Sequence, residues 1–102
     1  MIHVVAIITA KPGQREAVLT QFRAIVPVVH AEQGCIEYAP VIDVADAGAT
    51  RDKLGDDIFM VVEKWETAAA LRAHSAAPHM AAYAGKVKEM VASSAVHVLS
   101  PA

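Results

Sequence analysis

Cysteines, long apolar runs and leader-like segments are scarce in this sequence. Cys35 is the only cysteine among 102 residues, so no disulfide can form within the chain. A single cysteine is typical of a reducing compartment, and we expect a cytoplasmic location. No apolar run approaches the roughly 20 residues that cross a bilayer, so no membrane span is predicted. The apolar start, MIHVVAIITAKPG, has no basic region before it and is interpreted as a strand rather than a signal peptide.

Excess charge of one sign is also missing. The chain has 9 Lys and Arg residues against 11 Asp and Glu, a net charge of −2. Without a basic run or aromatic residues spaced for base stacking, nucleic-acid binding is not expected. No glycine-rich phosphate loop or dinucleotide fingerprint is present. What is abundant is apolar side chains, at 55% of the sequence. The usual share is about 45–50%, so the surplus predicts a subunit interface or a ligand cavity.

The hydrophobic pattern predicts one domain over residues 1–102 with the element order β-α-β-β-α-α-β. Strands are expected over 2–9, 35–44, 58–66 and 95–99, and helices from 14 to about 33, over 68–74, and from 78 to a break at Ser93 and Ser94. Pro27 should kink or end the first helix, and Pro40 indicates an edge position or a bulge. Thr67 is the expected N-cap of the second helix, and Pro78 the first residue of the third.

This order is that of a ferredoxin-like α+β fold, an antiparallel sheet with helices on one face. The first and third strands are apolar on both faces. The sheet face without helices should therefore be buried against a second copy, which predicts a homodimer. The polar segment 45–57 is the one long loop, and it is either a lid over a site or a dimer contact.

The stretch 58–79 holds most of the chemically useful side chains. Alternation along the strand places Glu63 and Trp65 on one face together with apolar residues, and His74 and His79 lie on either side of a helix break. We expect the reactive site here. Two histidines five positions apart across a break do not make a helical ligand pair. Since a metal site needs three or four ligands, no metal site is predicted.

Four stretches carry a resemblance to a known family. They are KPG at 11–13, EQGCIEY at 32–38, VEKWET at 62–67 and LRAHSAAPHM at 71–80. With these motifs the chain resembles the antibiotic biosynthesis monooxygenase family, and within it the bacterial quinol monooxygenases. The resemblance implies a dimeric α/β-barrel that oxygenates a quinol or dihydroxy-aromatic substrate with O₂ and without flavin, haem or metal.

The chain departs from two other branches of that family. Haem-degrading relatives carry an asparagine and a haem-ligating histidine where this sequence has Ala6 and Tyr83, so haem is not expected. Polyketide-tailoring relatives carry an asparagine where this sequence has Val61, so their substrate and proton relay do not transfer.

We therefore assign roles as hypotheses. His74 or His79 is the base that removes a phenolic proton, and Trp65 is an aromatic wall whose N–H donates to the substrate. The substrate-binding set is completed by the residues Tyr38, Tyr83 and Glu63.

Structural alternatives stay open for several of these residues. Glu63 would serve equally as an ion-pair partner of Arg72 or Lys88, His74 as a helix C-terminal cap, and His79 as a surface residue. Two other functions also stay open: an isomerase-like enzyme that works without oxygen, and a small-molecule-binding dimer without turnover.

Overall fold

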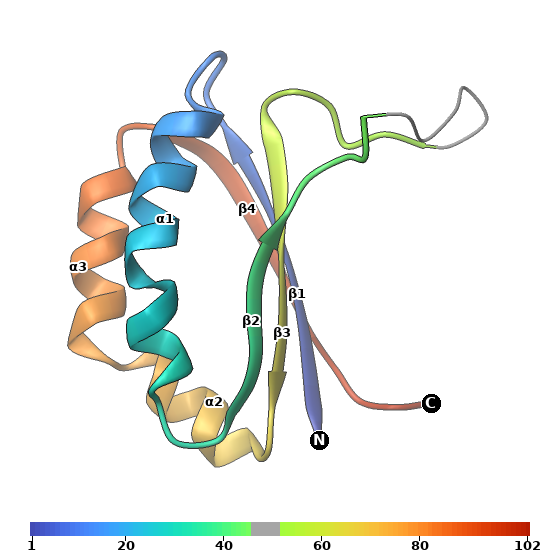
Figure 1. Ribbon diagram of the computed structural model, residues 1–102, viewed down its shortest axis with the longest axis vertical. Helices are drawn as coiled ribbons and strands as arrows, with labels where there is room; N and C mark the ends of the chain where they lie inside the picture. Colours follow the sequence, from blue (N-terminus) through green and yellow to red (C-terminus); the bar gives the residue numbers. More distant parts are fainter. Residues whose placement is uncertain (46–51) are drawn as a thin grey trace.

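A computed structural model of the protein describes residues 1–45 and 52–102 (Figure 1). In chain order its elements are β1 (Ile2–Ala10), α1 (Arg15–His30), β2 (Cys35–Val41), β3 (Ile58–Trp65), α2 (Ala68–Ser75), α3 (Pro78–Val87) and β4 (Val91–Leu99). The strands form an antiparallel sheet in the order β2-β3-β1-β4, and the helices cover one face of it (Figure 1). The α+β ferredoxin-like prediction is confirmed.

Strand β3 shows why the sheet has two different faces. Its alternate residues Phe59, Val61, Glu63 and Trp65 are all buried, as the alternation predicts. They face the helices together with the buried residues of β1, and they complete a core with α1. The core consists of Val4, Ala6, Ala10, Val18, Leu19, Phe22, Val29, Tyr38, Phe59, Val61, Trp65 and Val87.

The other face of the sheet carries apolar side chains that no helix covers. Val62 lies at its centre, paired with Val5 of β1 on one side and Ala39 of β2 on the other. All three are only partly buried, because neighbouring strands shield their sides while no helix in the described part of the chain covers this face. The predicted homodimer would use this face, and it remains a prediction.

The two prolines inside regular elements behave differently. The prediction that Pro27 kinks or ends α1 is wrong in part, because the helix runs on to His30. The proline lacks an N–H, but its carbonyl still accepts a hydrogen bond from the Ala31 N–H at 3.2 Å, so the last turn stays closed. Pro40 lies in β2, an edge strand, as predicted, and that strand is irregular between Cys35 and Glu37.

The end of α3 and the start of β4 also differ from the prediction. We expected a helix up to Ser93 and a strand from Ala95, whereas α3 ends at Val87 and β4 begins at Val91. Ser93 and Ser94 are strand residues paired with Thr9 and Ile8 of β1. Pairing with β1 decides the structure here, because the segment's own pattern of small apolar residues is compatible with a helix or a strand.

Residues 46–51 of the predicted 45–57 loop lie outside the described residues, so its role as lid or dimer contact stays untested. The segments that lead into and out of it are held to each other. The Asp43 carboxylate accepts hydrogen bonds from the backbone N–H groups of Leu54 and Gly55, both at 2.9 Å, and these bonds lower its pKa. No helix in the described part of the chain is long and apolar enough to cross a membrane.

Candidate active site

A cavity of about 300 Å³ lies between the inner face of the sheet and the helices. Its volume is at the lower end of the roughly 300–1,000 Å³ found for small-molecule sites. Its lining combines the apolar residues Val4, Ala6, Ile8, Phe22, Val61, Leu71, Met80 and Val96 with the polar residues Tyr38, Glu63, His74, Ser75 and Tyr83. Val96, on β4, is 62% exposed, so the cavity is open on the β4 side. A mainly apolar chamber with few polar groups is the expected form of a site for a small aromatic ligand.

A tight turn after α1 brings a carboxylate under the junction of α2 and α3. Gly34, at the end of this turn, has a φ of +84°, a conformation that favours glycine. A Cβ at Gly34 would lie 2.6 Å from the Ala70 Cβ of α2, so the turn and the helix are in close contact. The start of α2 is fixed by Thr67, whose hydroxyl accepts a hydrogen bond from the Ala70 N–H at 3.1 Å. Glu32 belongs to this turn and therefore faces both helices.

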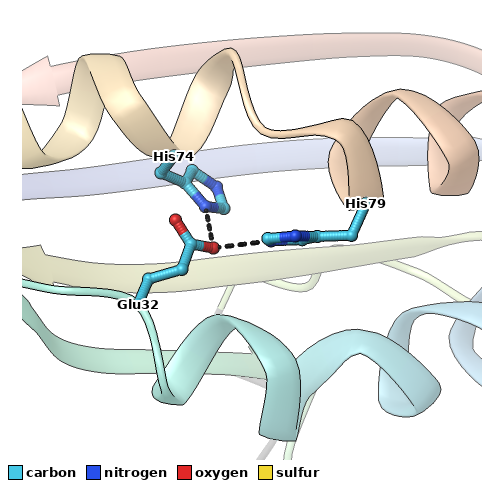
Figure 2. Close-up of side chains that lie close together, drawn as sticks. All are labelled: Glu32, His74 and His79. Atoms are coloured by element: carbon cyan, nitrogen blue, oxygen red, sulfur yellow. Dashed lines mark hydrogen bonds and ion pairs between the residues drawn. The ribbon is translucent and has the colours of Figure 1, made fainter.

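Glu32, His74 and His79 converge on one point (Figure 2). The Nδ1 of His74 lies 2.9 Å and the Nε2 of His79 lies 2.8 Å from the same atom, Oε2 of Glu32. An ionised carboxylate only accepts hydrogen bonds, so both ring nitrogens donate to it. In the neutral form of each ring, this bond leaves the lone pair of His74 on Nε2 and the lone pair of His79 on Nδ1.

Only one member of this cluster reaches the cavity. His74 lines it, whereas His79 lines a separate small pocket between α1 and α3, and its side chain is 28% exposed. The imidazole of His74 is held from two further sides, by the ring of Trp65 at 4.6 Å and by the ring of Tyr38 at 5.3 Å. The geometry therefore favours His74 over His79 as the group that meets a ligand.

Glu63 and Trp65 interact with each other rather than with the partners expected of them. The indole N–H of Trp65 donates to Oε1 of Glu63 at 2.9 Å, and both side chains are buried. Trp65 does not line the cavity, which corrects the hypothesis that it forms a wall and donates to the substrate. The ion pair of Glu63 with Arg72 or Lys88 is likewise not found among the described residues.

Burial sets the protonation of the acidic groups in the cavity. Burial raises the pKa of Glu63, against the lowering effects of the Trp65 N–H and of nearby His74. Burial also raises the pKa of Tyr83 to about 12, and burial together with the charge of Glu63 raises the pKa of Tyr38. Both tyrosines are therefore neutral at ordinary pH, and their hydroxyls are available as hydrogen-bond donors.

Sequence reasoning missed Glu32 as a site residue. The sequence shows an acid-x-Gly-Cys motif at 32–35. Nothing local in it indicates that this turn lies under the helix break some 40 positions later, at His74 and His79. In the sequence, the two histidines alone are too few ligands for a metal site. The structure adds a third donor: one ligand atom from each of Glu32, His74 and His79 lies within 4.8 Å of the other two.

Comparison with known proteins identifies the family of the chain. The family model described as antibiotic biosynthesis monooxygenase matches residues 1–86. The chain belongs to the antibiotic biosynthesis monooxygenase family. This family member is 44% identical over 103 aligned residues to a protein of Escherichia coli K12 named probable quinol monooxygenase YgiN, an alignment that covers 99% of this chain and 98% of that protein.

Solved structures with a similar fold match nearly the whole chain. The crystal structure of PA3566 from Pseudomonas aeruginosa matches with a TM-score of 0.80 at 27% identity, covering 99% of this chain and 93% of that one. The structure of Rv0793 from Mycobacterium tuberculosis matches with a TM-score of 0.79 at 26% identity, covering 99% and 94%. The family and the near full-length relative identify the protein as a monooxygenase-type enzyme.

Proposed function

We propose that the protein is a monooxygenase that oxidises a quinol or related dihydroxy-aromatic compound with O₂ and needs no flavin, haem or metal for turnover. The observation that carries the proposal is the orientation of His74, whose Nδ1 is bound to Glu32 while its ring lines an apolar cavity. The 44% identity to a protein named probable quinol monooxygenase supports the choice of substrate class.

The substrate itself supplies the electrons in this reaction. O₂ is a ground-state triplet and reacts slowly with closed-shell molecules, but an electron-rich quinolate can pass it one electron. The radical pair then joins at a ring carbon, and loss of water from the peroxide leaves a hydroxylated quinone. Quinol plus O₂ thus gives hydroxyquinone plus water, and no external reductant is required.

The protein's task is to form the quinolate and to protect it. A phenol has a pKa of about 10 and an imidazole about 6.5, so proton transfer to neutral His74 needs support at both ends. The Glu32 carboxylate stabilises the imidazolium that forms, because it already holds Nδ1 at 2.9 Å. Tyr38 and Tyr83, kept neutral by burial, would donate hydrogen bonds to the quinolate oxygen.

Glu63 and His79 take supporting roles in the proposal. Glu63 lines the cavity, and it is assigned to the second hydroxyl of the substrate because its other oxygen already binds Trp65. His79 stabilises the charge of Glu32 from the solvent side at 2.8 Å and acts as a positioning residue. The apolar remainder of the lining excludes water from the oxygen-derived intermediates.

The proposal extends to the assembly and location of the chain. Residues 1–102 are proposed to form one domain, because β4 pairs with β1 beyond the end of the family match. Two copies are proposed to form a homodimer through the uncovered sheet face around Val62. The single cysteine, Cys35, supports a cytoplasmic enzyme.

Oxygen uptake tests the proposal. Purified protein, freed of metal by chelator, is given a reduced naphthoquinol or a reduced benzoquinol, with a control that lacks protein and measures autoxidation. We expect protein-dependent uptake that chelator does not change, with one O₂ consumed per quinol and a hydroxylated quinone as product. Uptake no faster than autoxidation for both quinols would contradict the proposal and favour an isomerase or a binding protein.

A further inference from the structure

The cluster of Glu32, His74 and His79 has the ligands of a metal site as well as those of a catalytic base. We propose that it binds a divalent transition-metal ion of the zinc type, and that the bound ion switches the base off. Two imidazole nitrogens and one carboxylate oxygen are a donor set that zinc uses when it keeps an open position for water. The three donor atoms lie within 4.8 Å of one another.

The hydrogen bonds at this point show that the three potential ligand atoms converge there. Two protons now lie between the three donor atoms, one on the 2.9 Å bond from His74 and one on the 2.8 Å bond from His79. When those protons move to the other nitrogen of each ring, three lone pairs face a common centre. In the described part of the chain, the ion-pair partners of the Glu32 carboxylate are these two histidines.

Admitting the ion requires movement of all three side chains, because donor atoms that now lie within 4.8 Å of one another must take up the spacing of zinc ligands. Zinc lies about 2.0–2.2 Å from nitrogen and carboxylate oxygen ligands, so tetrahedral ligand atoms are about 3.3–3.5 Å apart. The two nitrogen-to-oxygen distances of 2.9 and 2.8 Å must lengthen by about half an ångström, which rotation of side-chain bonds can supply. His79 is 28% exposed and gives the ion a route from solvent that does not pass through the cavity.

Binding reverses the tautomer of His74. In the free protein Nδ1 carries the proton and Nε2 carries the lone pair that accepts a proton from the substrate. A metal bound to Nδ1 needs a lone pair on Nδ1, so the proton of that nitrogen moves to Nε2, and His74 becomes a hydrogen-bond donor instead of a base. His79 changes in the opposite sense, with its proton moving from Nε2 to Nδ1. No net proton is lost, and the carboxylate stays ionised.

Metal titration tests the site without reference to catalysis. Co²⁺ is added to the metal-free protein and followed by its visible absorption, and Zn²⁺ is titrated by calorimetry. We expect one ion per chain, with metal affinity at least about tenfold weaker in Glu32→Gln and in His79→Gln. Loss of a residue that only supports a ligand already weakens metal binding about 10–100-fold, and loss of a ligand should cost at least as much. The matched control is His97→Gln, an exposed histidine on β4 outside the cluster, which should bind as the wild type does.

Two results would overturn the site: no ion bound by the wild type, or equal affinity in His79→Gln and the wild type when both are folded by circular dichroism. Glu32→Gln keeps the size of the side chain and gives a second check if the histidine variant fails to fold. These readouts do not depend on quinol turnover, so the site can be confirmed even where the proposed function fails.

The switching effect rests on the proposed function and has its own measurement. With Zn²⁺ at about ten times its dissociation constant, oxygen uptake should fall to about a tenth, because occupancy follows mass action. Chelator should restore the rate. Equal or faster uptake by the zinc-loaded protein would overturn the switch while leaving the binding site in place.

Discussion

At the scale of single residues, the cavity depends on how a few polar groups are satisfied. None of the described residues has a side-chain N or O atom that is buried without a hydrogen-bond partner. Glu63 is one of these groups: its carboxyl is buried beside the cavity, and among the described residues its hydrogen-bond donor is the Trp65 N–H. A buried carboxylate without an ion-pair partner in the described chain destabilises the fold when it ionises.

Stability should therefore fall with pH in a way that Glu63→Gln removes. Burial raises the pKa of Glu63 in the folded state, so its contribution is fully present below the unfolded pKa of about 4.3 and is lost as pH rises through the folded value. We expect Glu63→Gln to raise the melting temperature relative to the wild type at pH 8 and to leave it unchanged at pH 4. A variant no more stable at pH 8 than the wild type would contradict this account of the buried carboxyl.

The site residues differ in how far they can be predicted from sequence. Glu63, Trp65, His74 and His79 come from one continuous strand-helix-helix unit, so local periodicity is enough to bring them together. Glu32 comes from a turn about 40 positions earlier, and only tertiary packing of α1 against the sheet sets its place. The direction of the Trp65 N–H could not be predicted either, since a strand pattern gives the face of a residue but not its rotamer.

At the scale of elements, the contact between α2 and the turn after α1 aligns the cluster. The backbone carbonyl of Gly34 accepts a hydrogen bond from the Glu66 N–H at 2.9 Å. Gly34 has no Cβ and so leaves room for the side chain of Ala70. Glu32 and His74 are carried by the two segments that this contact joins. Any change that separates them should disturb the bond between carboxylate and imidazole before it disturbs the sheet.

Gly34→Ala should show this at a single position. Its φ of +84° is unfavourable for alanine by about 1–2 kcal/mol. The new Cβ would also lie 2.6 Å from the Ala70 Cβ, and the alanine side chain has no rotatable bond that could relieve this contact. We expect a loss of at least about 2 kcal/mol in the free energy of unfolding, measured by urea denaturation.

The matched control for that variant is Gly85→Ala. Gly85 lies inside α3, and an added Cβ there meets nothing within 4 Å. Alanine should stabilise this helix by about 0.5–1 kcal/mol. If both variants shifted stability in the same direction and by similar amounts, the close contact at Gly34 would not be the cause.

Elements were predictable where their own pattern was strong. The alternation of β3, the cap at Thr67 and the start of α3 at Pro78 follow from local chemistry, and the structure confirms them. The start of β4 at Val91 was not predictable, because small residues there satisfy either period until β1 offers its backbone donors and acceptors.

At the scale of the whole molecule, the sheet has one covered and one uncovered face (Figure 1). The helices pack on the inner face and form the cavity, while the outer face presents apolar residues around Val62. An apolar sheet face of this kind is an expected interface between identical copies. The homodimer proposal depends on this face rather than on the helices.

Val62→Lys should dissociate the dimer. A lysine at the centre of the interface would be buried without a partner at a cost of about 3 kcal/mol or more, which weakens association by at least about a hundredfold. Light scattering at micromolar concentration should give about twice the chain mass of 10.8 kDa for the wild type and about that mass for the variant.

Val28→Lys is the control for the interface, since Val28 is 46% exposed on α1 and lies on the helical side. It should remain dimeric. A monomeric wild type, or a Val28→Lys variant that dissociates as readily as Val62→Lys, would contradict the assignment of the sheet face.

In the proposed mechanism His74, oriented by Glu32, takes the substrate's proton in the cavity. The most direct measurement is the turnover number of His74→Gln in quinol-dependent oxygen uptake, beside His97→Gln as a folded control with the same change outside the cavity. Loss of a general base should lower kcat by about 100-fold or more in a variant that is still folded by circular dichroism, and the control should keep the wild-type rate. A folded His74→Gln protein that turns over at the wild-type rate would contradict the account.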